Sequence, residues 1–146
     1  MLEHRELSDR IIGAAIHVHR TLGPGFLEKI YEEALCLALR QRGIRFARQY
    51  AIDVFFEGVK VGEHHLDLFV DTEMVVELKA VKAIEGAHFA TVRSYLRAVG
   101  KQHGLILNFA LPKLEIKRVI APLCSPPAFL TSCSPQKKEA WPSAPE

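Results

Sequence analysis

The sequence has no cysteine pair, no apolar run of membrane length and no marked excess of charge of either sign. Its three cysteines, Cys36, Cys124 and Cys133, are an odd number without CxxC spacing, which supports neither a disulfide framework nor a zinc site. No apolar run approaches the roughly 20 residues that cross a bilayer, and the polar start MLEHRELSDR does not fit a signal peptide. We therefore expect a cytoplasmic protein with no membrane partner.

Charge and composition are those of an ordinary globular protein. The net charge of +2 does not by itself indicate a nucleic-acid-binding protein, so any basic surface must come from clustering. With 146 residues, 49% of them hydrophobic, the chain is long enough for one domain with a real core. We expect that domain over residues 1–122, followed over residues 123–146 by a disordered tail rich in Pro and Ser.

The hydrophobic pattern predicts the element order ααβββαββ. A helical period runs through residues 8–22, about 26–42 and 84–100. Strand patterns follow the second helix in FARQYAIDVFF, VKVGEHHLDLFV and MVVELKA, and follow the third in HGLILNFA and LEIKRVIA. This order favours an α/β (α+β) fold with a mixed sheet flanked by helices. Alternation in the first strand predicts that one face carries Phe46, Tyr50, Ile52, Val54 and Phe56.

The hairpin formed by the second and third strands brings two acids together. A three-residue loop, Asp71 to Glu73, pairs Val70 with Met74 and so places Asp67 opposite Glu77. A two-residue loop would shift the parity and separate these acids. Lys79 is two residues after Glu77, so it points to the same face. The opposite face is then expected to carry Leu66, Leu68, Val76 and Leu78.

Two close carboxylates in an apolar sheet need a compensating cation. A hard divalent ion with oxygen ligands is suitable, and Mg²⁺ typically takes one or two carboxylates. The charge of Lys79 also suits a phosphate or a developing negative charge. The alternative is a solvent-facing patch with a structural salt bridge, because the D…ExK spacing alone is a weak motif.

Two helices carry further candidate residues. In GFLEKIY, Glu28 precedes Tyr31 by three residues, so both lie near one helical face. In the third helix, Arg93, Arg97 and Lys101 follow at i, i+4 spacing, which suits contacts to backbone phosphates but equally a solvated helix face.

The histidines give no sign of a metal site. His64 and His65 are adjacent on a strand and face opposite ways, so they cannot both hold one ion. His19 and His88 fall on apolar helical stripes and are expected to be core residues. We assign no histidine a ligand role.

GFLEKIY, with IGAAIHVHRTLGP before it and GEHHLDLFV and VVELKAV after it, resembles the GxxExxY family, which in turn resembles the PD-(D/E)xK nuclease superfamily. The resemblance covers about residues 11–119 and implies a restriction-endonuclease-like core. It also implies that the chain is a metal-dependent phosphodiesterase using Mg²⁺ or Mn²⁺, and that nucleic acid, DNA rather than RNA, is the partner.

The resemblance implies roles for particular residues. Asp67, Glu77 and Lys79 match the catalytic motif, and Glu28 joins Asp67 and Glu77 as a metal ligand. Apart from the resemblance, nucleic-acid contacts are expected from Arg93 and Arg97 by their spacing, and from the polar tip of Tyr95, whose default role is core packing.

One position departs from the family pattern. Thr91 stands where relatives often carry a glutamine, four residues before a tyrosine. This favours an alternative reading, in which the chain is a non-catalytic module that keeps the nuclease fold and binds nucleic acid or protein. A homodimer with a structural acidic patch is the third reading.

Overall fold

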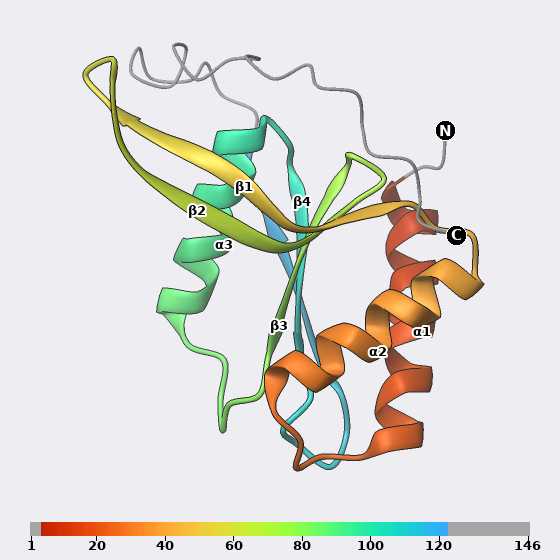
Figure 1. The fold of residues 1–146 in the computed structure, drawn as a ribbon. Coiled ribbons are helices and arrows are strands. Elements are labelled where there is room, and N and C mark those ends of the chain that lie inside the picture. The colour runs from red at the N-terminus through yellow and green to blue at the C-terminus, as the bar shows by residue number, and fades with distance from the viewer. Residues whose placement is uncertain (1–3, 123–146) are drawn as a thin grey trace.

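The computed structural model describes residues 4–122, which form three helices and five strands in the order ααβββαββ (Figure 1). The elements are α1 (His4–Leu22), α2 (Glu28–Gln41), β1 (Phe46–Phe56), β2 (Val59–Val70), β3 (Met74–Lys79), α3 (Gly86–Val99), β4 (His103–Asn108) and β5 (Glu115–Ile120). The predicted element order is therefore confirmed. The predicted tail, with Cys124 and Cys133, lies outside the described residues.

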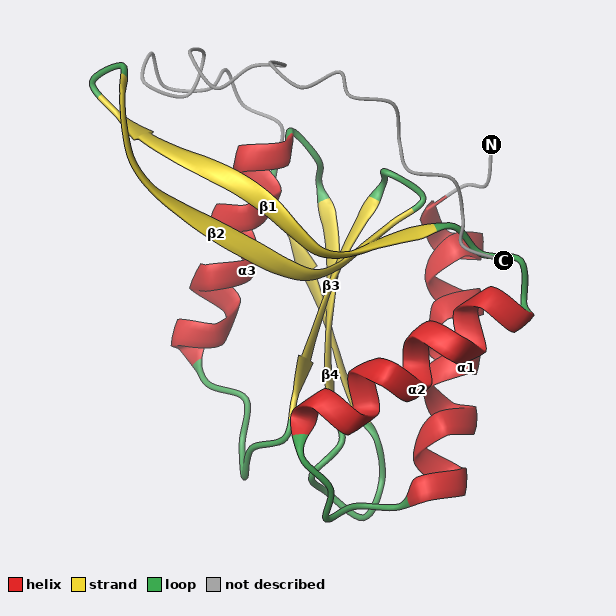
Figure 2. Cartoon of the chain, viewed as in Figure 1, coloured by secondary structure: helices red, strands yellow, loops and turns green. Residues whose placement is uncertain are grey.

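The strands form one mixed sheet in the order β1-β2-β3-β4-β5. Neighbouring strands are antiparallel except β3 and β4, which are parallel and joined through α3. Helices α1 and α2 cover one face of the sheet and α3 covers the other, as Figures 1 and 2 show. None of the described helices is long and apolar enough to cross a membrane.

Each face of the sheet has its own apolar core. The core on the side of α1 and α2 contains Leu68, Val76 and Leu78, as predicted, and packs them against helix residues such as Leu35. Cys36 is also buried there, and burial raises the pKa of its thiol to about 11, so it is a packing residue. The core on the side of α3 is built from alternate strand residues, including Phe69, Val75 and Ile106, packed on Val92, Tyr95 and Leu96.

The prediction of the faces of β1 and β2 is wrong around Gln49. Phe46 packs into the core of α1 and α2, whereas Tyr50 and Ile52 pack on the α3 side. Leu66, predicted to share a face with Leu68, also belongs to the α3 side. The physical reason is Gln49, whose φ of 50° interrupts the regular alternation of β1.

Candidate functional site

Strands β2 and β3 pair only near their connecting turn and then separate. The predicted three-residue loop is confirmed, because Val70 pairs with Met74, and the last backbone pair is Leu68 with Val76. Beyond it, β2 continues with β1 alone and β3 continues with β4 as far as Lys79. We call this opening the strand fork, defined by Asp67 on one side and Glu77 and Leu78 on the other.

Side chains replace backbone pairing across the strand fork. The backbone N–H of Asp67 donates to Oε1 of Glu77 at 3.1 Å, and the backbone N–H of Leu78 donates to Oδ2 of Asp67 at 3.0 Å. The predicted juxtaposition of Asp67 and Glu77 is thus present, and each carboxylate satisfies a donor of the opposite strand. Within the part of the chain that the structure describes, Oε2 of Glu77 accepts no hydrogen bond.

Burial makes the ionised forms of both carboxyls costly. Glu77 is only 5% exposed. Burial, together with the charge of Asp67, raises the pKa of Glu77 to about 8. Burial likewise raises the pKa of Asp67 to about 6, with smaller contributions from Glu32 and Glu28, against the N–H of Leu78 and the charge of Lys79. The pair therefore lacks sufficient positive charge from the protein itself.

Lys79 ends β3 on the same side as Glu77 and is half-buried. Its charge lowers the pKa of both fork carboxyls, although among residues 4–122 it forms no ion pair within 4.0 Å. Its ammonium group is therefore near the acids but not committed to either of them. A cation in this position can contact a third, anionic group.

Asn108, which sequence reasoning missed, fixes the backbone around Lys79. It pairs with Lys79 across β3 and β4 and is completely buried. Its Oδ1 accepts from the N–H of Val81 at 3.1 Å and that of Ala110 at 3.2 Å, and its Nδ2 donates to the carbonyl of Val81 and to Glu115. The sequence signal for it was a lone amide in the apolar run HGLILNFA.

Glu28 is the first residue of α2, and its side chain is exposed. Its charge raises the pKa of both Asp67 and Glu77, so it lies within electrostatic reach of the strand fork. In the described residues, however, no group of three His, Cys, Asp or Glu side chains is arranged to hold a metal ion. The structure therefore brings Asp67 and Glu77 together, and the role of Glu28 as a ligand stays a prediction.

Tyr31 holds the loop that precedes Glu28. Its ring is completely buried and stacks on Phe109, with ring centroids 4.6 Å apart. Its hydroxyl donates to the carbonyl of Gly23 at 2.6 Å and accepts from the N–H of Phe26 at 3.1 Å. Gly25 between them has a φ of 113°, which favours glycine. The GxxExxY pattern thus encodes the turn that starts α2.

A polar network that sequence reasoning also missed joins α2 to the strand fork. Arg48 donates to the carboxylates of Glu32 and Glu33. Gln49 donates from Nε2 to Oε1 of Glu32 at 3.0 Å and, in a longer contact, to Oδ1 of Asp67 at 3.4 Å. Nothing in the local sequence indicates this network, because it joins residues from three elements.

Comparison with known families agrees with this geometry. Residues 5–119, most of the chain, match the family described as the PD-(D/E)XK nuclease superfamily. The chain belongs to the PD-(D/E)XK nuclease superfamily. No curated protein and no solved structure matches the chain.

Membership of the PD-(D/E)XK superfamily supports a nuclease-like function in general, and its nucleases generally use divalent metals. The five-stranded mixed sheet with helices on both faces is consistent with the restriction-endonuclease-like fold of that superfamily.

Helix α3 also carries a buried tyrosine, Tyr95. Tyr95 is 9% exposed and packs in the α3-side core. Burial raises the pKa of its hydroxyl, and the charges of Glu77 and Asp67 raise it further, so the hydroxyl lies within electrostatic reach of both acids. His64 contacts the same ring at a centroid distance of 5.6 Å, while the neighbouring His65 pairs with Glu63, so the two histidines face apart as predicted.

The other residues predicted on α3 differ in their surroundings. Arg97 is exposed and Arg93 half-buried, and neither has an ion-pair partner among the described residues. Lys101 lies beyond the end of α3 and pairs with Glu73 at 3.1 Å, so it does not continue the basic row. Thr91 is exposed and donates its hydroxyl to the carbonyl of Ala87, so it does not reach the strand fork.

Two predicted core histidines take structural roles. His19 is buried and contacts the carbonyl of Leu111 at 2.9 Å, as expected for a satisfied core residue. His88 is half-buried and instead accepts the N–H of Glu85 at 2.9 Å in the reciprocal cap of α3. Its predicted core position is therefore wrong, because the start of α3 lies at the surface.

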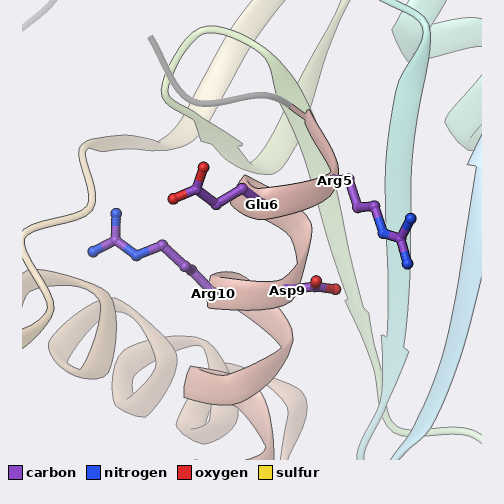
Figure 3. A pocket seen from close by; sticks show the side chains of 4 residues that line it. All are labelled: Arg5, Glu6, Asp9 and Arg10. Carbon is purple, nitrogen blue, oxygen red and sulfur yellow. The ribbon is translucent and has the colours of Figure 1, made fainter.

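Two hollows of the described surface lie away from the strand fork. One, of about 380 Å³, is lined by Arg5, Glu6, Asp9 and Arg10 of α1 (Figure 3). Its two basic and two acidic side chains leave it without net charge. A second, of about 370 Å³, lies at the opposite ends of β3 and β4 from Lys79, beside Met74 and His103. Neither of these two hollows is lined by Asp67, Glu77 or Lys79.

Proposed function

We propose that this protein is a divalent-metal-dependent nuclease that hydrolyses phosphodiester bonds at the strand fork. The observation that carries the proposal is the position of the Asp67 and Glu77 carboxylates at one opening in the sheet, where each accepts a backbone N–H of the opposite strand and Glu77 is buried. Lys79 on the same side supplies the third motif residue. Membership of the PD-(D/E)XK superfamily supports the same reading.

The residues of the strand fork fit Mg²⁺ or Mn²⁺. Both prefer oxygen ligands, and the fork offers the free Oε2 of Glu77 and Oδ1 of Asp67, whose hydrogen bond is long. We propose that Asp67 and Glu77 hold the ion and that Glu28 contributes directly or through water. Bound there, the ion supplies charge that polarises the scissile phosphate and lowers the pKa of a water.

The protein's own residues would position the reactants. Lys79 would hold a positive charge against the phosphate as negative charge builds on it, or orient the attacking water. Arg93 and Arg97 on α3 would contact backbone phosphates, with the polar tip of Tyr95 nearby. DNA is the first nucleic acid to test, with RNA as the alternative. We further propose a cytoplasmic location, and a homodimer is the oligomeric state to test.

A cleavage assay with matched variants tests the proposal. Purified protein is incubated with single- and double-stranded DNA and RNA in Mg²⁺ or Mn²⁺ and, separately, in chelator. We expect cleavage only with the metal, and its loss by at least about 100-fold in Asp67→Asn and Lys79→Ala. Lys82→Ala is the control, because Lys82 is exposed and three residues beyond the motif. Equal cleavage by wild type and both motif variants would refute the assignment.

Thr91 supports a second candidate function, a module that binds nucleic acid without cutting it. The hydroxyl of Thr91 is occupied by the carbonyl of Ala87, so α3 offers no carboxamide at this position. Such a module would retain nucleic acid on a gel in chelator and release no product in Mg²⁺ or Mn²⁺. Product formation that depends on Asp67 would exclude it.

A further inference from the structure

Gln49 has a backbone conformation that its position in β1 does not explain. Its φ is 50° in the middle of an 11-residue strand, whereas the other non-glycine residues with positive φ, Glu57, Asp71 and Thr72, lie in turns. β1 and β2 keep one register on either side of it, with Arg48 opposite Leu68 and Tyr50 opposite Leu66. No inserted residue therefore forces the conformation.

Left-handed backbone is unfavourable in a non-glycine residue and persists where surrounding contacts impose it. Here it occurs directly opposite Asp67, since Arg48 and Tyr50 pair with the residues on either side of Asp67. The strain thus lies at the strand fork.

The side chain of Gln49 connects two acids. Its Nε2 is 3.0 Å from Oε1 of Glu32 and 3.4 Å from Oδ1 of Asp67. Ionised carboxylates only accept hydrogen bonds, so the nitrogen end of the amide must face them and both of its hydrogens are used. The amide oxygen accepts no hydrogen bond from the described residues. The orientation of the Gln49 amide is therefore set by the two carboxylates, which can only accept hydrogen bonds.

The far end of this bridge is firmly held. Glu32 is 7% exposed on α2 and also accepts from Arg48, so its carboxylate is fixed by a charged partner. Glu32 therefore provides a rigid anchor for the amide. Among residues 4–122, the side chain of Asp67 has one other hydrogen bond, in which its Oδ2 accepts from the N–H of Leu78. A single hydrogen bond leaves a carboxylate free to rotate, and Gln49 supplies the second contact.

We infer that Gln49 is a positioning residue. Its amide links the fixed carboxylate of Glu32 on α2 to Oδ1 of Asp67, the oxygen proposed to face the metal, and so holds that oxygen in place. The inference rests on the proposed metal-binding role of Asp67. Since Thr91 is turned to Ala87, Gln49 is also the carboxamide that the described residues bring to Asp67. The strained φ is the cost of aiming this amide between the two acids.

The test measures Mn²⁺ affinity by calorimetric titration of the full chain. Gln49→Met keeps the length of the side chain and removes both donors. Gln49→Asn keeps the amide and tolerates left-handed backbone, but is too short to span both acids. We expect each to weaken Mn²⁺ binding about 10-fold, as for other residues that orient metal ligands. Gln41→Met, an exposed glutamine at the end of α2, is the control and should bind as wild type does.

Kinetics separates positioning from a structural effect. Where the wild type cleaves, a positioning role predicts that both Gln49 variants lower kcat with KM unchanged, at a saturating metal concentration. Unaltered Mn²⁺ affinity and kcat in both variants would overturn the inference while leaving the proposed function intact. Failure of both variants to fold, judged by circular dichroism, would also overturn it, since Gln49 would then serve folding. Absence of Mn²⁺ binding in the wild type would instead refute the proposed metal site, and this inference with it.

Discussion

At the scale of single residues, the carboxylates of Asp67 and Glu77 accept backbone hydrogen bonds that carbonyl groups accept in a regular sheet. Each carboxylate accepts one N–H from the opposite strand, where β2 and β3 no longer pair. Hydrogen bonds from backbone N–H groups favour the ionised form of a carboxyl, but here burial outweighs them and raises both pKa values. The protein therefore maintains an acidic pair that is unfavourable when both members are charged.

This cost predicts a stability that falls with pH when no metal is present. At low pH both carboxyls are protonated in the folded and unfolded states, and they cost nothing. As pH rises past the ordinary value of 4.5, Glu77 ionises only in the unfolded chain until about pH 8, so the free energy of unfolding falls across this range. We expect a fall of about 2–4 kcal/mol between pH 5 and 8.5 in chelator, measured by urea unfolding.

Glu77→Gln provides the matched variant, because its amide oxygen can still accept the N–H of Asp67. In this variant the free energy of unfolding should fall much less between pH 5 and 8.5. At pH 8.5 the variant should unfold at a higher urea concentration than wild type. Glu57→Gln, at an exposed turn, should retain the fall. A wild-type urea midpoint that stays constant from pH 5 to 8.5 would show that ionising the fork acids does not destabilise the folded protein.

At the scale of elements, the start of α2 depends on one hydroxyl. Helix α2 has no side-chain cap at its start, and Tyr31 instead fixes the preceding loop through Gly23 and Phe26. We predict that Tyr31→Phe costs about 1–3 kcal/mol, since the carbonyl of Gly23 and the N–H of Phe26 lose two partly buried hydrogen bonds. Urea unfolding measures the loss.

Glu28 directly follows the loop that Tyr31 fixes. Tyr31→Phe should therefore also lower nuclease activity at 25 °C by more than the loss of folded protein accounts for. Full activity in a destabilised Tyr31→Phe protein would mean that the loop does not position Glu28.

The elements also show what the sequence could and could not predict. Periodicity and turn residues predict the order of helices and strands, and the length of the β2–β3 loop predicts the pairing that opposes Asp67 and Glu77. The faces of β1 were not predictable, because one residue, Gln49, takes a left-handed φ that long-range contacts impose. The partners of Glu32 and Asn108 were hidden for the same reason, since they come from distant parts of the chain.

At the scale of the whole molecule, attraction for nucleic acid must come from local clusters of positive charge rather than from the net charge. A net charge of +2 gives little general attraction for nucleic acid. The β1–β2 pair diverges from the central strands at the fork, and α3 lies on the same side of the sheet as this pair (Figure 1). Arg93 and Arg97 on the same helix carry charge that no described residue neutralises. Binding should therefore depend on these two side chains more than on the total charge.

Salt dependence of binding tests this arrangement. In chelator, so that no cleavage occurs, the slope of log K against log salt should fall in magnitude by about 2 in Arg93→Gln/Arg97→Gln, because each phosphate that the protein no longer neutralises lowers it by roughly 0.9. Arg5→Gln/Arg20→Gln removes the same charge from exposed positions on α1, across the sheet from α3, and should leave the slope nearly unchanged. Fluorescence anisotropy with a labelled oligonucleotide measures both. Equal slopes in the two double variants would mean that affinity follows total charge, and that nucleic acid does not approach the strand fork along α3.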